Sequence, residues 1–152
     1  MDFGLSDEQL ALIEAVERTC APFDDDYWSR CEEDHRFPHE FYGAFAQGGW
    51  LGIAMPEEFG GSGLGMTEVA LLMLTISRMG GAMAAASSIH INIFGPHPIV
   101  VHGTLEQKQR WLPPIIEGRE KTCGGVTEPD AGLDTGRLKT RADRVSDGYV
   151  IN

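Results

Sequence analysis

The sequence predicts a mainly α-helical protein that changes to short extended segments towards its end. Through residue 120, apolar residues recur at steps of three and four, which is the period of an amphipathic helix. Two Ser/Thr-x-x-Gln patterns open such stretches, as expected at helix N-termini. Glycine and proline residues separate the stretches. We therefore expect a helical domain over residues 1–120 and the beginning of a β domain, incomplete, over residues 121–152.

The first helix is expected to begin after Ser6, since Gln9 stands at the position that completes a capping box. Acidic residues in its first turn suit the helix dipole. Its predicted apolar stripe consists of Leu10, Ile13, Val16 and Cys20. Pro22 is then expected to interrupt the helix.

Further helices are predicted over residues 24–34, 37–47, 67–79 and 82–94. Between them, residues 50–65 (WLGIAMPEEFGGSGLG) are dense in glycine and proline, and we expect a loop that crosses the surface of the helical body. A short apolar segment follows at residues 99–102. Thr104 opens the second capping-box pattern and a last helix, which Pro113 and Pro114 are expected to interrupt two turns later.

After Lys121 the pattern changes to short extended pieces. These are expected at residues 123–127, 137–144 and 149–152. Ser146-Asp147-Gly148 supplies a hairpin turn before the last of them. Because Asn152 falls within a predicted strand, we expect the chain to stop inside the β domain.

Charge limits the classes of partner. The chain has 23 acidic and 12 basic residues and a formal net charge of −11. This balance disfavours binding to nucleic acid or to an anionic membrane surface, because both carry negative charge. It does not exclude a small anionic ligand, since a few local Arg or backbone N–H groups can hold one phosphate.

The three cysteines, Cys20, Cys31 and Cys123, form no C-x-x-C pair. We therefore predict neither a disulfide framework nor a zinc site. The same observation predicts that the protein works in a reducing compartment. No apolar run approaches the ~18 residues of a membrane span, and no charged-then-apolar leader opens the chain. These features predict a cytoplasmic protein without a membrane span, although a mature organellar protein has the same features.

The common catalytic motifs are missing from the sequence. It has no G-x-x-x-x-G-K-[ST] phosphate loop, no H-E-x-x-H zinc helix and no G-x-S-x-G nucleophile elbow. The glycine cluster of residues 60–65 does not complete G-x-G-x-x-G, because Met66 stands where the last glycine is needed. The five histidines are scattered over several segments, so no metal site is predicted.

The segment CGGVTEPDAGLDT, residues 123–135, is the strongest candidate for a binding site. Gly124 and Gly125 leave little side-chain bulk in an extended run, so that a flat ligand can lie against exposed backbone N–H and C=O groups. Thr127 adds a hydroxyl that can donate or accept a hydrogen bond. From the residues alone, a ligand site and an ordinary hairpin corner both stay open.

Three motifs resemble those of one family, and they stand in the family's order. VTEPDAGLD, residues 126–134, resembles the flavin-binding signature of acyl-CoA dehydrogenases, usually T-E-P-x-A-G-S-D. Residues 50–65 resemble the family's G-x-P-E-E-Y/F-G-G-x-G-x-G loop. HGTLEQKQRWLPPIIEG, residues 102–118, resembles its G-T-E-E-Q-K-x-x-x-L-P helix. With the opening L-S-D-E-Q, the matches cover nearly the whole chain.

The resemblance implies a fold, a cofactor and a reaction. The fold is the up-and-down helical N-terminal domain of an acyl-CoA dehydrogenase, followed by the first strands of a β-barrel-like domain. Such an enzyme uses FAD to convert an acyl-CoA thioester to the trans-2-enoyl-CoA, and an electron-transfer flavoprotein accepts the electrons. The family is usually homo-oligomeric, and a eukaryotic member is expected in the mitochondrial matrix.

The resemblance also implies roles for single residues. The cofactor-binding positions are Gly124, Gly125, Val126, Thr127, Gly132 and Leu133. The substrate-binding positions are Leu133 together with Ile91 and Phe94, which stand on a helix that lines the acyl pocket in the family. The family usually has Ser where this chain has Leu133, so polar contact there can come only from the backbone. No catalytic residue is assigned, since the family's carboxylate base is expected beyond Asn152.

Two alternatives stay open beside an acyl-CoA dehydrogenase that is inactive as an isolated chain. An acyl-CoA oxidase on the same fold returns its electrons to oxygen. A non-catalytic helical interaction module, completed by a partner chain, needs no base. Glu57 and Glu58 are interpreted as solvated loop residues, and Glu128 as a structural partner within its turn, so none of the three replaces the base.

Overall fold

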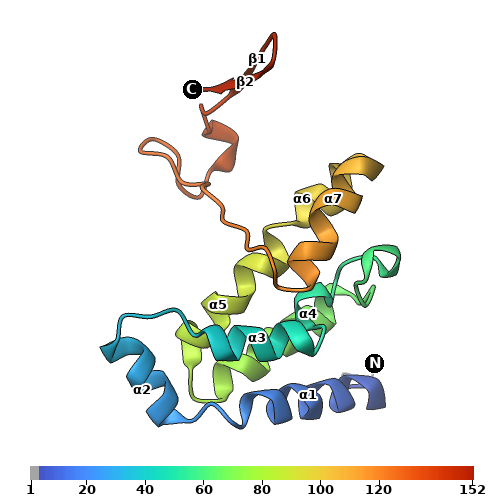
Figure 1. Ribbon diagram of the computed structural model, residues 1–152, viewed down its shortest axis with the longest axis vertical. Helices are drawn as coiled ribbons and strands as arrows, with labels where there is room; N and C mark the ends of the chain where they lie inside the picture. Colours follow the sequence, from blue (N-terminus) through green and yellow to red (C-terminus); the bar gives the residue numbers. More distant parts are fainter. Residues whose placement is uncertain (1–3) are drawn as a thin grey trace.

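The structure, a computed structural model, describes residues 4–152 and confirms a mainly α-helical fold with a small antiparallel sheet at its end. The α-helices among these residues are α1 (Asp7–Cys20), α2 (Asp25–Glu33), α3 (His39–Gln47), α4 (Met66–Arg78), α5 (Ala82–Phe94), α6 (His97–His102) and α7 (Leu105–Ile116). In Figure 1 the first five gather in one body, and the C-terminal hairpin extends away from it.

Local sequence signals account for most of the helix boundaries. Ser6 and Gln9 form the predicted capping box of α1, in which each side chain bonds the other residue's backbone N–H at 3.2 and 3.1 Å. Thr104 does the same for α7. The bounds of α5 agree with the predicted range. Pro38 precedes α3 as its N-cap. A proline is tolerated there because an N–H at the start of a helix has no partner within the helix.

The core lies where α1, α3, α4 and α5 meet. α4 packs against both α1 and α5, and α3 packs against the same two helices. The fully buried apolar side chains of this core are Val16, Phe41, Phe45, Leu51, Ile53, Val69, Leu72, Ile76 and Ile89. Phe41 meets the rings of Phe23 and Trp28 edge to face, with centroids 5.2 and 5.0 Å apart, a geometry that aromatic pairs prefer.

The predicted apolar stripe of α1 is partly wrong. Leu10 is 47% exposed, Ile13 is only half-buried, and Leu12 takes the buried position beside Val16 and Cys20. A helix turns about 100° per residue, so residue 10 lies ~120° around the axis from residue 16. Three-residue steps therefore drift off the buried face, whereas the four-residue steps from Leu12 stay on it.

The glycine-rich loop is more than a surface crossing. It contains two 3-10 turns, η1 (Trp50–Gly52) and η2 (Glu57–Phe59), and buries four of its apolar side chains. These are Leu51, Ile53, Met55 and Phe59. Gly61 makes the fold of the loop possible, because a Cβ there would stand 2.1 Å from the Met55 carbonyl oxygen.

The prolines of α7 do not interrupt it, contrary to the prediction. α7 runs through Pro113 and Pro114 to Ile116, and the short segment expected at residues 99–102 belongs to helix α6. The two prolines remove backbone donors to residues 109 and 110, which are exposed. Burial of the opposite face of α7 against the loop residues Met55 and Phe59 keeps the helix intact.

The sheet is a hairpin of β1 (Ala142–Val145) and β2 (Gly148–Ile151), joined by the predicted turn. Ala142 pairs with Ile151, and Val145 with Gly148. Residues 137–141 are not strand, since the 3-10 turn η3 (Thr135–Arg137) occupies their start. The strand predicted at residues 123–127 is wrong: in the part of the chain that the structure describes, no backbone hydrogen bond pairs this segment with another one.

Substitution at two leucines of α1 tests the corrected helix face. Leu12→Ala should lower the free energy of unfolding by about 2–5 kcal/mol, because it empties a buried site. Leu10→Ala is the matched control on the exposed face and should cost at most about 0.5 kcal/mol. Urea unfolding followed by circular dichroism measures both, and equal costs would contradict the assignment.

Candidate functional site

The candidate site begins where the chain leaves the helical body. After α7 the chain returns to α5 and then extends away from the helical body towards the hairpin (Figure 1). The Thr122 hydroxyl donates to the Ile91 carbonyl oxygen at 2.7 Å, which fixes this return to α5. Gly124 lies next to Ile91, since a Cβ added to it would meet Ile91 Cδ1 at an ordinary 3.8 Å. The structure thus brings the predicted cofactor segment beside one predicted substrate residue.

Residues 123–127 present their backbone to the surroundings. The segment is exposed throughout, and Val126 is 57% exposed. A Cβ built on Gly125 would meet nothing within 4 Å. Open backbone of this kind leaves N–H and C=O groups that a flat polar ligand can bind. Cys123 is a free, exposed thiol, while Cys20 and Cys31 are free and buried.

Glu128 closes the loop that follows. Its two carboxylate oxygens accept the backbone N–H groups of Lys139 and Thr140, each at 2.8 Å. Lys139 also forms an ion pair with Asp130, at 2.8 Å. Hydrogen bonding from the Thr140 side chain, and then from these two N–H groups, holds the pKa of Glu128 below its ordinary value of 4.5. Glu128 is therefore a structural partner, as interpreted from the sequence.

The closed loop carries the other two predicted cofactor residues at its tip. Gly132 and Leu133 lie in the middle of the loop, and the Leu133 side chain is fully exposed. Both stand further along the chain than Gly124, which lies beside α5. Glu57 and Glu58 are exposed residues of η2, also as interpreted.

A pocket of about 380 Å³ lies between α4 and α5. It is lined by Met73, Ser77, Met83, Ala86, Ser87 and His90. Neither Ile91 nor Phe94 lines it, but the Phe94 ring lies 4.8 Å from the His90 ring, at its rim. Sequence reasoning missed Met83, and it considered His90 beside Ile91 and Phe94 but did not select it. The signal that was available is their helical spacing with Phe94, which puts all three on one face of α5.

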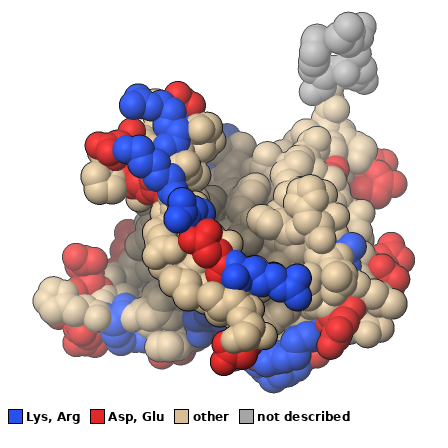
Figure 2. Space-filling model, turned by 90° about the horizontal axis from the view of Figure 1, so that it is seen from above, with Lys and Arg blue, Asp and Glu red and all other residues tan. Residues whose placement is uncertain are grey.

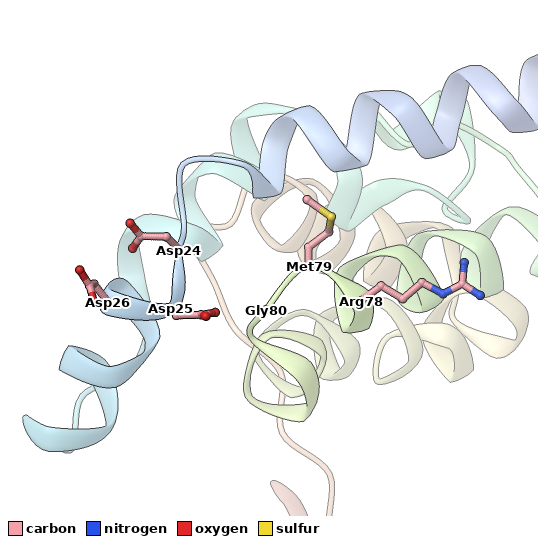
Figure 3. Close-up of a pocket in the computed structure, with 6 residues that line it drawn as sticks. All are labelled: Asp24, Asp25, Asp26, Arg78, Met79 and Gly80. Atoms are coloured by element: carbon pink, nitrogen blue, oxygen red, sulfur yellow. The ribbon is translucent and has the colours of Figure 1, made fainter.

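A second hollow lies between the start of α2 and the end of α4. Asp24, Asp25 and Asp26 line it together with Arg78 (Figure 3). The three carboxylates do not converge, and the Arg78 side chain points away from them. Asp24 serves as the N-cap of α2, accepting the Tyr27 N–H at 2.9 Å. Helix capping explains this cluster, and within residues 4–152 no group of three or more His, Cys, Asp or Glu is arranged to hold a metal ion.

Charge is unevenly distributed along the chain. Residues 119–152 contain six acidic and six basic residues, so the whole formal charge of −11 comes from residues 1–118. Figure 2 looks at the molecule from the end where the hairpin lies, and it shows basic and acidic side chains intermingled on this face. The candidate site is therefore free of the acidic excess that would repel an anionic ligand. No helix formed by the described residues is long and apolar enough to cross a membrane.

The fold and the motifs place this chain in a family of flavoenzymes. Residues 6–119 match the family described as "Acyl-CoA dehydrogenase, N-terminal domain". The chain belongs to this family.

Individual relatives agree with that assignment. Acryloyl-CoA reductase (NADH) of Anaerotignum propionicum is 36% identical over 155 aligned residues, covering 100% of this chain and 39% of the relative. A solved glutaryl-coenzyme A dehydrogenase in complex with glutaryl-CoA has a TM-score of 0.85 at 27% identity, covering 100% of this chain and 39% of that one. An acyl-CoA dehydrogenase from Bacillus anthracis complexed with FAD has a TM-score of 0.78 at 30% identity, with 97% and 26% covered. The chain thus spans well under half the length of each.

The loop closed by Glu128 should open only in acid. The pKa of Glu128 is lowered in the folded protein, so its contribution is complete above pH 4.5 and is lost as the pH falls through the lowered value. NMR amide shifts of Lys139 and Thr140 should stay constant down to about pH 4.5 and move below it. Glu128→Gln is the control and should remove this transition. A midpoint above pH 4.5 would contradict the role.

Proposed function

We propose that this chain is the helical domain, residues 1–120, and the beginning of the β domain, residues 121–152, of an FAD-dependent acyl-CoA dehydrogenase. The observation that carries the proposal is the open glycine segment, residues 123–127, lying beside Ile91 on α5. This arrangement puts a surface suited to a flat ring next to a helix face suited to an acyl chain. Family membership supports the same assignment.

The residues present fit a flavin. Gly124 and Gly125 allow close approach of a ring to the backbone, and the backbone groups of the segment have no competing partners among the described residues. Thr127 offers a hydroxyl, and Val126 an apolar contact. Gly132 and Leu133 would reach the cofactor from the loop tip, with Leu133 contributing no side-chain hydrogen bond. When bound, FAD supplies the acceptor for a hydride from the substrate.

The acyl group would lie on α5. Ile91 and Phe94 are the proposed contacts, and the pocket between α4 and α5 extends the same surface past His90 to Met83. Its lining is mostly apolar, as an acyl chain requires. The thioester end would then point towards residues 123–127, and Leu133 is the proposed contact from the loop.

Removal of the α-proton needs a carboxylate base, and we assign that base to sequence outside these 152 residues. A base whose pKa is lowered is a weaker proton acceptor, so Glu128, which holds its loop closed, is a poor choice. On this proposal the isolated chain is inactive. The whole enzyme would form homo-oligomers, pass electrons to an electron-transfer flavoprotein, and work in the cytoplasm, or in the mitochondrial matrix of a eukaryote.

A second candidate is reduction of the same bond. It is favoured by one specific observation, the 36% identity to a protein described as an NADH-dependent acryloyl-CoA reductase. Reduction of an enoyl-CoA is the reverse of the proposed dehydrogenation, so the same residues would serve both directions.

Rapid-mixing measurements on the complete protein that carries this chain test these proposals. Anaerobic addition of a saturated acyl-CoA should bleach the visible absorbance of the bound flavin. Faster reoxidation by an electron-transfer flavoprotein than by oxygen supports the dehydrogenase, and the reverse order supports an oxidase. Bleaching by NADH, reversed by an enoyl-CoA, supports the reductase. Failure to bind flavin would exclude all three and leave a helical interaction module.

Thr127→Val tests the cofactor segment directly. Loss of one hydrogen bond should weaken FAD binding by about 0.5–1.5 kcal/mol, or roughly 2- to 13-fold in Kd. Thr135→Val is the matched control, because Thr135 is an exposed threonine of the neighbouring loop. Fluorescence titration of the apoprotein with FAD measures both variants. Equal affinities for the two would show that Thr127 makes no flavin contact.

A further inference from the structure

Asn92 is a polar residue in the last turn of the apolar helix α5, and its side chain is fully buried. Both polar atoms of its amide have hydrogen-bond partners. The amide nitrogen donates to the Tyr42 hydroxyl and, at 3.2 Å, to the Glu120 carbonyl oxygen. The amide oxygen accepts the backbone N–H of Thr122 at 3.0 Å and lies 3.3 Å from its hydroxyl oxygen.

Three of these four contacts reach the chain just before the cofactor segment. Thr122 completes the connection, because its hydroxyl also bonds the carbonyl oxygen of Ile91. Gly95 allows the close approach, since a Cβ there would stand 2.7 Å from the Thr122 hydroxyl oxygen. Asn92 and Thr122 thus join α5 to residues 120–122 through side-chain bonds on both sides.

The connection lies immediately before the cofactor segment in the chain. In the described structure, residues 123–127 have no backbone hydrogen bond to the helical body, and the next one along the chain joins Glu128 to Ala131 within its own loop. The position of the segment relative to α5 therefore depends on how Thr122 is held. The substrate residue Ile91 is the direct neighbour of Asn92 on α5.

We propose that Asn92 and Thr122 are positioning residues, which set the distance between the cofactor segment and the substrate face of α5. This inference rests on the proposed function. Neither side chain would touch the reacting atoms. Hydride transfer needs the reacting atoms about 3–3.5 Å apart, and a misplacement of about 1 Å can slow a reaction roughly 100-fold. A shift at Thr122 would move the cofactor segment, but the cofactor surface and the substrate surface would both still bind their ligands.

A purely structural role for the pair makes a different prediction, and Thr75 provides the comparison. Thr75 is a buried threonine whose hydroxyl donates to the Leu71 carbonyl oxygen at 2.8 Å, within α4. Thr75→Val and Thr122→Val each delete one such bond. Only Thr122→Val should alter the path of residues 123–127.

The experiment compares four forms of the complete flavoprotein: wild type, Thr122→Val, Thr122→Ser and Thr75→Val. We expect Thr122→Val to slow flavin reduction by about 10- to 100-fold, with the substrate dissociation constant changed by no more than about threefold. Thr122→Ser keeps the hydroxyl and should restore the rate to within about threefold. Thr75→Val should lower Tm while leaving the rate within about twofold of wild type. Asn92→Ala should slow reduction as Thr122→Val does.

Hydrogen exchange separates a positioning role of Thr122 from a purely structural one. In Thr122→Val, the amide of residue 122, which donates to Asn92 Oδ1, should exchange faster than in wild type, and in Thr75→Val it should not. If the flavin of the wild type is reduced normally, and Thr122→Val and Thr75→Val show equal rates of flavin reduction, the positioning role alone is overturned. If no acyl-CoA reduces the flavin of the wild type and no enoyl-CoA reoxidises it, the proposed function is overturned. The positioning role is then overturned with it.

Discussion

A buried amide must have partners for all of its polar atoms, because each unpaired one costs about 1–3 kcal/mol. Asn92 meets this requirement inside α5 only when residues 120–122 come back to the helix after α7. The path of the chain out of the helical body is therefore fixed by the core. The same requirement sets the point from which the open glycine segment leaves the helical body.

The helical body was largely predictable because its signals are local. The capping boxes at Ser6 and Thr104 and the glycines on either side of α5 depend only on neighbouring residues. Errors arose where tertiary packing decides. Leu10 looks as buried as Leu12 until α4 selects one face of α1, and the prolines of α7 are tolerated because that helix packs on Met55 and Phe59.

The candidate site was predictable in a different way. Family motifs located residues 123–127 without any knowledge of their surroundings, and the strand expected there is missing because a strand needs a neighbour to pair with. Periodicity could not find Asn92, since it reports which face of a helix is apolar and is silent on the partner of a buried polar group. Met83 was missed, and His90 was not selected, for a related reason: their pocket exists only once α4 lies beside α5.

The ionisation of the carboxyl groups bears on the proposed chemistry. Among the described residues, every carboxyl group with a resolved shift, namely Glu8, Glu40, Glu68 and Glu128, has its pKa lowered. Hydrogen bonds to the charged form cause this. They lie at helix starts for Glu8 and Glu68, join Glu40 to Arg36 and Tyr27, and close the loop at Glu128. A proton-abstracting carboxylate needs the opposite environment, in which burial raises its pKa towards the working pH. These carboxylates therefore serve the fold, and the proposed function leaves proton removal to a group held in a drier setting.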